Sequence, residues 1–317
     1  MYIIEIYNCF RNFYSIMIKK TTSYDWCENG EEQQYLNLIR DILVKGSLEN
    51  GRNGSTLSIF GASMRFSLEN KIPILTTKKV PWKTCFKELL WFIKGSTDNN
   101  ELKKNGVHIW DQHATRECLD SLGLTHYKED DLGPIYGHQW RHFNAPYENC
   151  HSDYTRKGVD QLQYIIDILK KPQERNSRRL VMTAWNPCQL NEMALPPCHV
   201  LAQFNVSHGN KLSCSVYQRS GDVGLGVPFN IASYSLLTHL IAKHCDLEPY
   251  EFVYFLGNAH IYENHLDVLF KQINREPFVF PTIEIKEKRE KIEDYTMNDI
   301  VISNYKCHEP LKMDMTI

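Results

Sequence analysis

The segment that most constrains the fold is NIASYSLLTHLIAKHC, at residues 230–245, because it is apolar on almost every side. A helix without a broad polar face is buried within a large domain. The chain has 317 residues, which is enough to build a core of that depth. Its 42% hydrophobic and 23% charged residues are typical of a globular protein.

Several other segments have clear periodic patterns. Apolar residues at helical spacing predict helices at residues 31–44, 82–95 and 159–171. Alternating patterns predict strands at residues 178–185, 199–206, 211–219 and 251–257. Residues 56–68 predict two strands joined by a turn. Because strands and helices do not alternate strictly, we predict a single-domain α+β fold with a large mixed or antiparallel sheet covered by helices.

Charge and cysteine content narrow the function classes. A net charge of −2 argues against a wholly basic nucleic-acid-binding surface. No apolar run reaches the ~18 residues that a membrane helix needs. The ten cysteines form no CxxC pair, so neither a zinc ribbon nor a redox motif is supported. We therefore expect free thiols and no bound metal. We also expect a cytoplasmic location, with a nuclear pool left open.

The stretch ALPPCHVLAQF, at residues 194–204, contains the cysteine with the strongest case for chemistry. A cysteine is usually a small buried hydrophobe, but the double proline before Cys198 fixes its backbone. Neighbouring side chains of a strand point to opposite faces, so His199 should not face the thiol. An activating cation must then come from elsewhere, and Arg219 in YQRSGDVGLGVPFN is a candidate. The alternative for that stretch is a glycine-rich turn with a paired arginine and aspartate.

Several further polar residues can each be interpreted either as functional or as structural. Arg52, Arg178 and Arg179 offer guanidinium forks that suit a phosphate monoester, or they are solvated surface arginines. Glu88 lies within an apolar helical stripe. It is either exposed at the edge of the stripe or buried with a raised pKa that suits acid–base work.

Six motifs together identify a family. In chain order they are ELLWFIKGST, LGPIYGHQWRHF, NSRRLVMTAWNP, ALPPCH, YQRSGDVGLGVPFNIASY and YKCHEPLKMDMTI. The chain resembles thymidylate synthase of the eukaryotic type, without a fused reductase, from about residue 32 to the end. The resemblance implies an N-terminal extension at 1–31 and a synthase domain at 32–317. It also implies a homodimer that packs through the sheet, with no requirement for membrane or nucleic acid.

The resemblance implies reductive methylation of dUMP to dTMP. The donor of carbon and hydride would be 5,10-methylenetetrahydrofolate, with dihydrofolate as product and no metal. Cys198 would add to C6 of the uracil ring, as thiolates add reversibly to the β-carbon of a conjugated carbonyl. Glu88 would organise proton transfer at the C4 carbonyl, and Tyr136 would help to remove the C5 proton. Arg219, Asp222 and Asn230 would complete the catalytic set.

The same resemblance assigns the binding residues. The dUMP site would contain Arg52, Arg219, Ser220, Gly221, Asp222, Asn230, His260, Ile261 and Tyr262, with Arg178 and Arg179 from the other subunit. The folate site would contain Lys78, Trp110, Asp222, Gly226, Phe229 and Thr316, with Ile317 closing over it. Asn258 replaces the aspartate that is usual in the family, which leaves open whether His260 is supported there. The loop at Arg52 is one residue shorter than usual.

Three other functions stay open at this stage. A pyrimidine hydroxymethylase of the same superfamily would trap the one-carbon unit with water. The carboxamide of Asn230 argues for uracil rather than cytosine, because it both donates and accepts a hydrogen bond. A thiol hydrolase of the Cys–His type rests on the tetrapeptide PPCH alone. The last alternative is a non-catalytic nucleotide- or RNA-binding protein.

Overall fold

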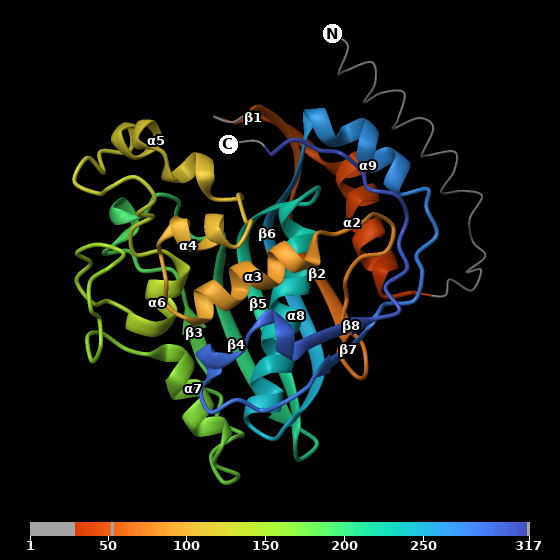
Figure 1. The fold of residues 1–317 in the computed structure, drawn as a ribbon. Coiled ribbons are helices and arrows are strands. Elements are labelled where there is room, and N and C mark those ends of the chain that lie inside the picture. Colours follow the sequence, from red (N-terminus) through yellow and green to blue (C-terminus); the bar gives the residue numbers. More distant parts are fainter. Residues whose placement is uncertain (1–28, 52–53, 316–317) are drawn as a thin grey trace.

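The computed structural model describes residues 29–51 and 54–315, and its centre is a six-stranded sheet (Figure 1). The strand order is β1-β2-β6-β5-β4-β3. These strands are β1 Ser47–Gly51, β2 Gly54–Ser67, β3 Val181–Thr183, β4 His199–Ser207, β5 Lys211–Asp222 and β6 Glu248–Tyr262. All neighbours pair antiparallel except β5 and β6, which are parallel. The predicted α+β class with a mixed sheet is therefore confirmed.

The helices lie on one face of this sheet and beside its edges (Figure 1). They are α2 Glu32–Lys45, α3 Trp82–Ile93, α4 Asn99–Lys104, α5 Arg116–Ser121, α6 Tyr136–His142, α7 Gln161–Leu169, α8 Gly226–His244 and α9 Leu266–Gln272. A two-stranded sheet of β7 Thr282–Ile285 and β8 Ile300–Ser303 follows. Helix α8 contacts β5, β6 and α3 and is buried along most of its length, so the prediction of an interior helix is confirmed. Within the described ranges, no helix combines the length and apolar character that crossing a bilayer requires.

One predicted turn is wrong. Residues 56–68 do not form two strands, because β2 runs through them as a single strand paired with β6. Phe60 pairs with Asn258 and Ala62 with Leu256, so the register is the same on both sides of Gly61. Gly61 has a φ of 87°, a conformation that glycine adopts without a steric penalty. The glycine allows a local distortion of the strand and not a reversal of the chain.

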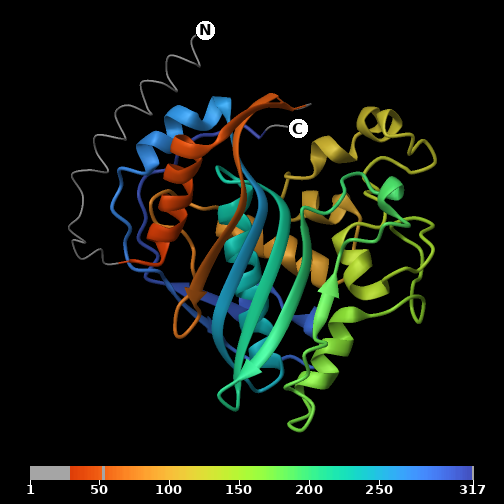
Figure 2. The same cartoon turned by 180° about the vertical axis from the view of Figure 1, so that it is seen from behind.

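Among the described residues, no helix lies over the central strands on the far face of the sheet (Figure 2). Large apolar side chains on this sheet remain exposed, among them Val181, Tyr217 and Phe255. Tyr217 and Phe255 are paired residues of β5 and β6, so their side chains form one continuous apolar area. Contiguous exposed apolar area of this kind marks interaction surfaces.

Glu32 fixes α2 to the loop that precedes α3. Its buried carboxylate accepts hydrogen bonds from the backbone N–H groups of Thr76 and Thr77, at 2.9 and 2.8 Å. The hydroxyl groups of the same two threonines donate at 2.6 and 2.7 Å. Burial raises the pKa of Glu32, and these four donors oppose that rise. The interaction fixes the backbone that leads directly to Lys78.

Replacing Glu32 with alanine should destabilise the fold. The substitution leaves four buried donors without their acceptor, so we expect the free energy of unfolding to fall by at least about 3 kcal/mol. Urea-induced unfolding of the two proteins would measure it. Asn37→Ala, on the exposed face of the same helix, is the control and should stay within about 0.5 kcal/mol of the parent. Equal losses in the two variants would show that Glu32 is not an anchor.

Candidate functional site

Cys198 lies immediately before β4, and two backbone hydrogen bonds fix its position. Its N–H donates to the hydroxyl oxygen of Tyr136 at 2.7 Å. Its carbonyl oxygen accepts from the backbone N–H of Arg219 at 2.9 Å. The β4–β5 pairing is irregular between His199 and Leu201, so the ladder breaks just after this cysteine. Irregularities of this kind are common beside active sites, where they re-aim a side chain.

The guanidinium of Arg219 is the cation beside this thiol. Its Nη2 lies 4.0 Å from Sγ of Cys198, and its Nε and Nη2 donate to the carbonyls of Pro197 and Pro196 at 2.8 and 3.0 Å. It also lies over the ring of Trp185, with its Cζ 5.4 Å from the ring centroid. Burial raises the pKa of Cys198, and the charge of Arg219 opposes this rise. The guanidinium therefore favours the thiolate in a site that otherwise disfavours it.

His199 points into the interior. Its Nδ1 lies 2.6 Å from the hydroxyl of Tyr234, and its ring stacks on Tyr136 with centroids 4.0 Å apart. Burial lowers the pKa of His199 to about 3. A neutral ring hydrogen-bonded on the far side of the strand cannot serve as the base for Cys198, and this geometry removes the basis for the Cys–His hydrolase.

The parallel pairing of β5 with β6 aligns two groups of predicted residues. Ser220 pairs with Asn258, and Asp222 pairs with His260. Oδ1 of Asn258 lies 3.0 Å from Nδ1 of His260, so Asn258 supports this ring. An asparagine oxygen accepts here as a carboxylate oxygen would. The rings of His260 and Tyr262 meet edge to face at 5.2 Å.

Gly221 and Ile261 were both predicted to line the nucleotide site, and both are buried in the sheet. A Cβ on Gly221 would meet Leu256 at 2.8 Å and Val227 at 3.0 Å. Gly221 is therefore required for the close packing of β5 against its neighbours. Ile261 is fully buried, so no surface of this residue is open to a ligand in this structure.

Glu88 is buried in α3, so the edge-exposed reading of this residue is wrong. Only 7% of the residue is exposed, and its Oε1 accepts from Nε1 of Trp110 at 2.7 Å. Burial raises the pKa of Glu88 to about 7, although the indole N–H opposes the rise. Trp110 lies edge to face with Tyr136, with centroids 6.2 Å apart. Because the Tyr136 hydroxyl accepts from the backbone N–H of Cys198, these side chains connect the carboxyl to the backbone of that cysteine.

A second cluster lies around the loop after β5. Oδ1 of Asp222 accepts from the N–H of Gly224 at 2.8 Å and lies 3.8 Å from Nδ1 of His265. The ammonium of Lys78 donates to the Gly224 carbonyl, and burial lowers the pKa of Lys78 to about 8 although Asp222 opposes this. Lys78 is thus buried against the loop, and this position does not favour attraction of a folate tail from solvent.

His265 is a residue that the sequence patterns did not indicate. It is fully buried, and its Nε2 lies 2.8 Å from the carbonyl oxygen of Asp314. A Cβ on Gly224 would lie 2.9 Å from its Nδ1 and 3.1 Å from Sδ of Met313. His265 therefore joins the C-terminal segment to the Asp222 loop. No local motif distinguishes this histidine from the other twelve.

Asn230 lies in the first turns of α8, beside Asp222. A Cβ on Gly226 would lie 3.9 Å from Oδ1 of Asn230 and 4.0 Å from Cβ of Asp222. The half-buried carboxamide of Asn230 makes no hydrogen bond to the described residues. Nearby, the carbonyl of Phe229 accepts from the thiol of Cys85 at 3.1 Å. The start of α8 therefore offers a free amide next to a carboxylate.

The paired arginines lie away from the cysteine of their own chain. Arg178 and Arg179 are exposed and precede β3, whose Val181 pairs with Gln203 of β4. At about 3.3 Å per residue, the pair lies more than roughly 16 Å along the sheet from Cys198. Arg52, Thr316 and Ile317 fall outside the described residues.

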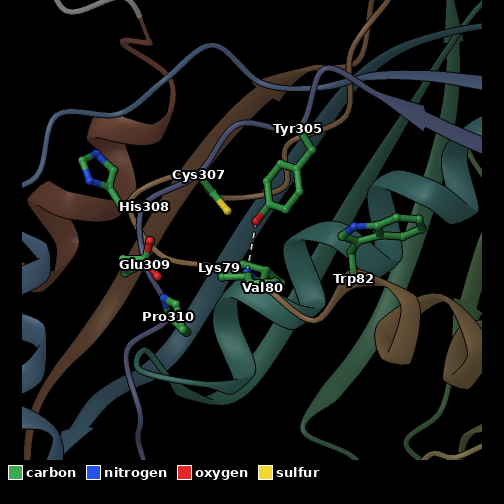
Figure 3. Close-up of a pocket in the computed structure, with 8 residues that line it drawn as sticks. All are labelled: Lys79, Val80, Trp82, Tyr305, Cys307, His308, Glu309 and Pro310. Carbon is green, nitrogen blue, oxygen red and sulfur yellow. Dashed lines mark hydrogen bonds between the residues drawn. The ribbon is translucent and has the colours of Figure 1, made fainter.

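A pocket of about 490 Å³ lies at a different place (Figure 3). It is lined by Lys79, Val80, Trp82, Tyr305, Cys307, His308, Glu309 and Pro310. The hydroxyl of Tyr305 accepts from the N–H of Val80 at 3.0 Å and donates to the carbonyl of Leu75 at 2.8 Å. None of the predicted catalytic or binding residues that the structure describes lines this pocket, so it does not contain the chemistry around Cys198.

Glu88→Gln should remove a pH-dependent loss of stability. Between about pH 4.5 and 7 the native state retains a proton on Glu88 that the unfolded state has released. The free energy of unfolding therefore falls as the pH rises through this window, by about 3 kcal/mol in total. Urea-induced unfolding at pH 5, 6, 7 and 8 should show this loss in the parent and not in the variant. The exposed Glu117→Gln should retain the parent slope, and an unchanged slope in Glu88→Gln would contradict the assignment.

Comparison with known proteins agrees with the six motifs. Residues 33–317 match the family model described as thymidylate synthase. The bifunctional dihydrofolate reductase-thymidylate synthases of Zea mays and Leishmania major are each 52% identical over 90% and 91% of this chain, which spans 55% and 56% of their lengths. The thymidylate synthase of human herpesvirus 8 is 51% identical over 90% of this chain and 85% of its own length. The chain belongs to the thymidylate synthase family.

Proposed function

We propose that this chain catalyses the reductive methylation of dUMP to dTMP with 5,10-methylenetetrahydrofolate, and releases dihydrofolate. The observation that carries the proposal is the 4.0 Å approach of the Arg219 guanidinium to the Cys198 thiol, in a chain of the thymidylate synthase family. We place the active domain at residues 32–317 and the protein in the cytoplasm.

Cys198 is the nucleophile. Its thiolate forms a bond to C6 of the uracil ring, and the electron pair of the C5–C6 double bond moves toward the C4 carbonyl. C5 thereby becomes a carbon nucleophile. Glu88, whose pKa is about 7, holds a proton that it can donate to O4 and later recover. Elimination of Cys198 at the end restores the double bond and the free thiol.

Tyr136 acts between these two groups. Burial raises the pKa of Tyr136 well above its usual range, so its hydroxyl stays protonated at neutral pH. Because the oxygen already accepts from the Cys198 N–H, the hydroxyl proton is directed elsewhere, where it orients a water molecule for removal of the C5 proton.

The remaining residues bind the nucleotide. Arg219 and Ser220 bind the phosphate, and the free carboxamide of Asn230 pairs with N3–H and O4 of uracil. His260 and Tyr262 bind the ribose, and Asn258 sets the orientation of the His260 ring. Burial lowers the pKa of His260, although Asp222 opposes this, so the ring is neutral at pH 7.

The folate supplies the one-carbon unit and the hydride. The side chains at the start of α8 fit such a ligand, because half-buried Phe229 offers an aromatic edge and Asp222 has one oxygen without a partner among the described residues. A flat heteroaromatic ring could contact the Phe229 ring, and its N–H donors could bond to the Asp222 oxygen. Trp110 would contact the same ring, and Gly226 leaves room beside it.

We also propose a homodimer that packs through the far face of the sheet. The exposed apolar residues Tyr217 and Phe255 would be covered there. Arg178 and Arg179 lie too far along the sheet to reach the Cys198 of their own chain, and a second copy would bring them to its phosphate site.

Cys198→Ser should abolish the reaction while leaving the fold intact. The hydroxyl is a far weaker nucleophile, so we expect kcat to fall about 10⁴-fold or more. The absorbance rise of dihydrofolate, with dUMP and methylenetetrahydrofolate supplied, measures it. The exposed Cys188→Ser is the matched control and should retain the parent rate. Substantial turnover by Cys198→Ser would refute covalent catalysis.

Mixing inactive variants tests the shared phosphate site. Cys198→Ser and Arg179→Ala chains, refolded together, should recover about a quarter of the parent rate, because half of the dimers are hybrids with one intact site. Cys198→Ser mixed with Arg219→Ala should recover nothing, because both residues belong to the same chain's site. Equal recovery in the two mixtures, or none in the first, would contradict the shared-site proposal.

A further inference from the structure

We propose that Asp98, Cys150 and His151 form a binding site for a zinc-type divalent cation, separate from the catalytic residues. One ligand atom from each residue lies within 4.8 Å of the other two. The three donors are a carboxylate oxygen, a thiol sulfur and an imidazole nitrogen. Zinc accepts all three, and a site with three protein ligands leaves a fourth position for water.

The two oxygens of Asp98 have different environments. Oδ1 accepts from the backbone N–H and the side-chain amide of Asn100, at 2.9 and 3.0 Å. Oδ2 makes no such bond and lies 3.9 Å from Nδ1 of His151. This separation is too long for a hydrogen bond. It is close to the roughly 3.3 Å between two ligands that each lie about 2.0 Å from a tetrahedral zinc ion.

The backbone brings these ligands together with a second buried carboxylate. Asp98 and Asp131 are joined by a β-bridge, and both are buried. Oδ2 of Asp131 accepts from the backbone N–H of Cys150 at 3.1 Å, which fixes the thiol next to Asp98. Two carboxylates so close to one thiol create a negative potential that favours a bound cation.

The donor set and the exposure define which cation would enter. A thiolate with an imidazole selects zinc and related thiophilic metals over magnesium or calcium, which prefer oxygen. Side-chain exposure is 68% for His151 and 10% for Asp98, and Cys150 is half-buried. The site is thus buried in the protein on the side of Asp98 and open to solvent on the side of His151. Bound metal would link the start of α4 to the loop at residues 145–155.

No sequence motif indicates this site, and the expectation of no metal followed from the missing CxxC pair. Asp98 and Cys150 are 52 residues apart, so no local spacing rule relates them. Tertiary contacts make them neighbours, among them the Asp98–Asp131 bridge and the hydrogen bond from Cys150 to Asp131.

Titration with Co²⁺ tests the proposal on the full chain. We expect saturable binding with a thiolate-to-cobalt absorption band, displaced by Zn²⁺. In Cys150→Ser the band should disappear from this site and the affinity should fall about tenfold or more. Cys188→Ser, which removes an exposed thiol elsewhere, should keep both the band and the affinity of the parent.

Two further variants separate ligation from folding. Asp98→Asn keeps an oxygen that accepts from the Asn100 N–H, but it removes the charge. His151→Gln changes an exposed side chain. Both should weaken binding by about tenfold and leave the unfolding midpoint of the metal-free chain unchanged. Parent-like cobalt binding in Cys150→Ser, or no saturable binding by the parent, would overturn the site. Neither result depends on the catalytic activity.

Discussion

The register of β5 against its two neighbours is the constraint on which the site depends. Parallel pairing with β6 places Ser220 and Asp222 beside Asn258 and His260. Antiparallel pairing with β4 brings the Arg219 backbone to the carbonyl of Cys198. A shift of one residue in either ladder would turn these side chains to the opposite face of the sheet. The buried helix α8 packs on β5 and β6 and keeps the register fixed.

Burial changes the pKa values of three groups around the site, a carboxyl, an imidazole and a thiol. Burial raises the pKa of Glu88 to about 7, which keeps a proton available near neutrality. Burial lowers the pKa of His199 to about 3, which removes a base from the immediate neighbourhood of Cys198. The Cys198 thiol is also disfavoured as an anion by burial, and the charge of Arg219 opposes this. The thiolate is therefore favoured by a guanidinium that two proline carbonyls hold in place.

Local sequence patterns predicted the elements well and the tertiary relations poorly. The all-round apolar helix and the α+β class followed directly from periodicity. The continuous strand through Gly61 did not, because a glycine in an alternating segment is compatible with either a turn or a bent strand. The burial of Glu88 could not be predicted from local sequence, because its hydrogen-bond donor is Trp110, which lies 22 residues away in the chain. His265 and the Asp98–Cys150–His151 cluster depend on long-range contacts that no spacing rule describes.

The central claim is that Cys198 bonds covalently to the pyrimidine in a site built by the β4–β5–β6 register. Peptide mapping by mass spectrometry, after acid quenching during turnover with dUMP and methylenetetrahydrofolate, tests it most directly. The account predicts a nucleotide adduct on the peptide that contains Cys198 and on no other cysteine peptide. Turnover without any adduct, or an adduct on a different thiol, would contradict it.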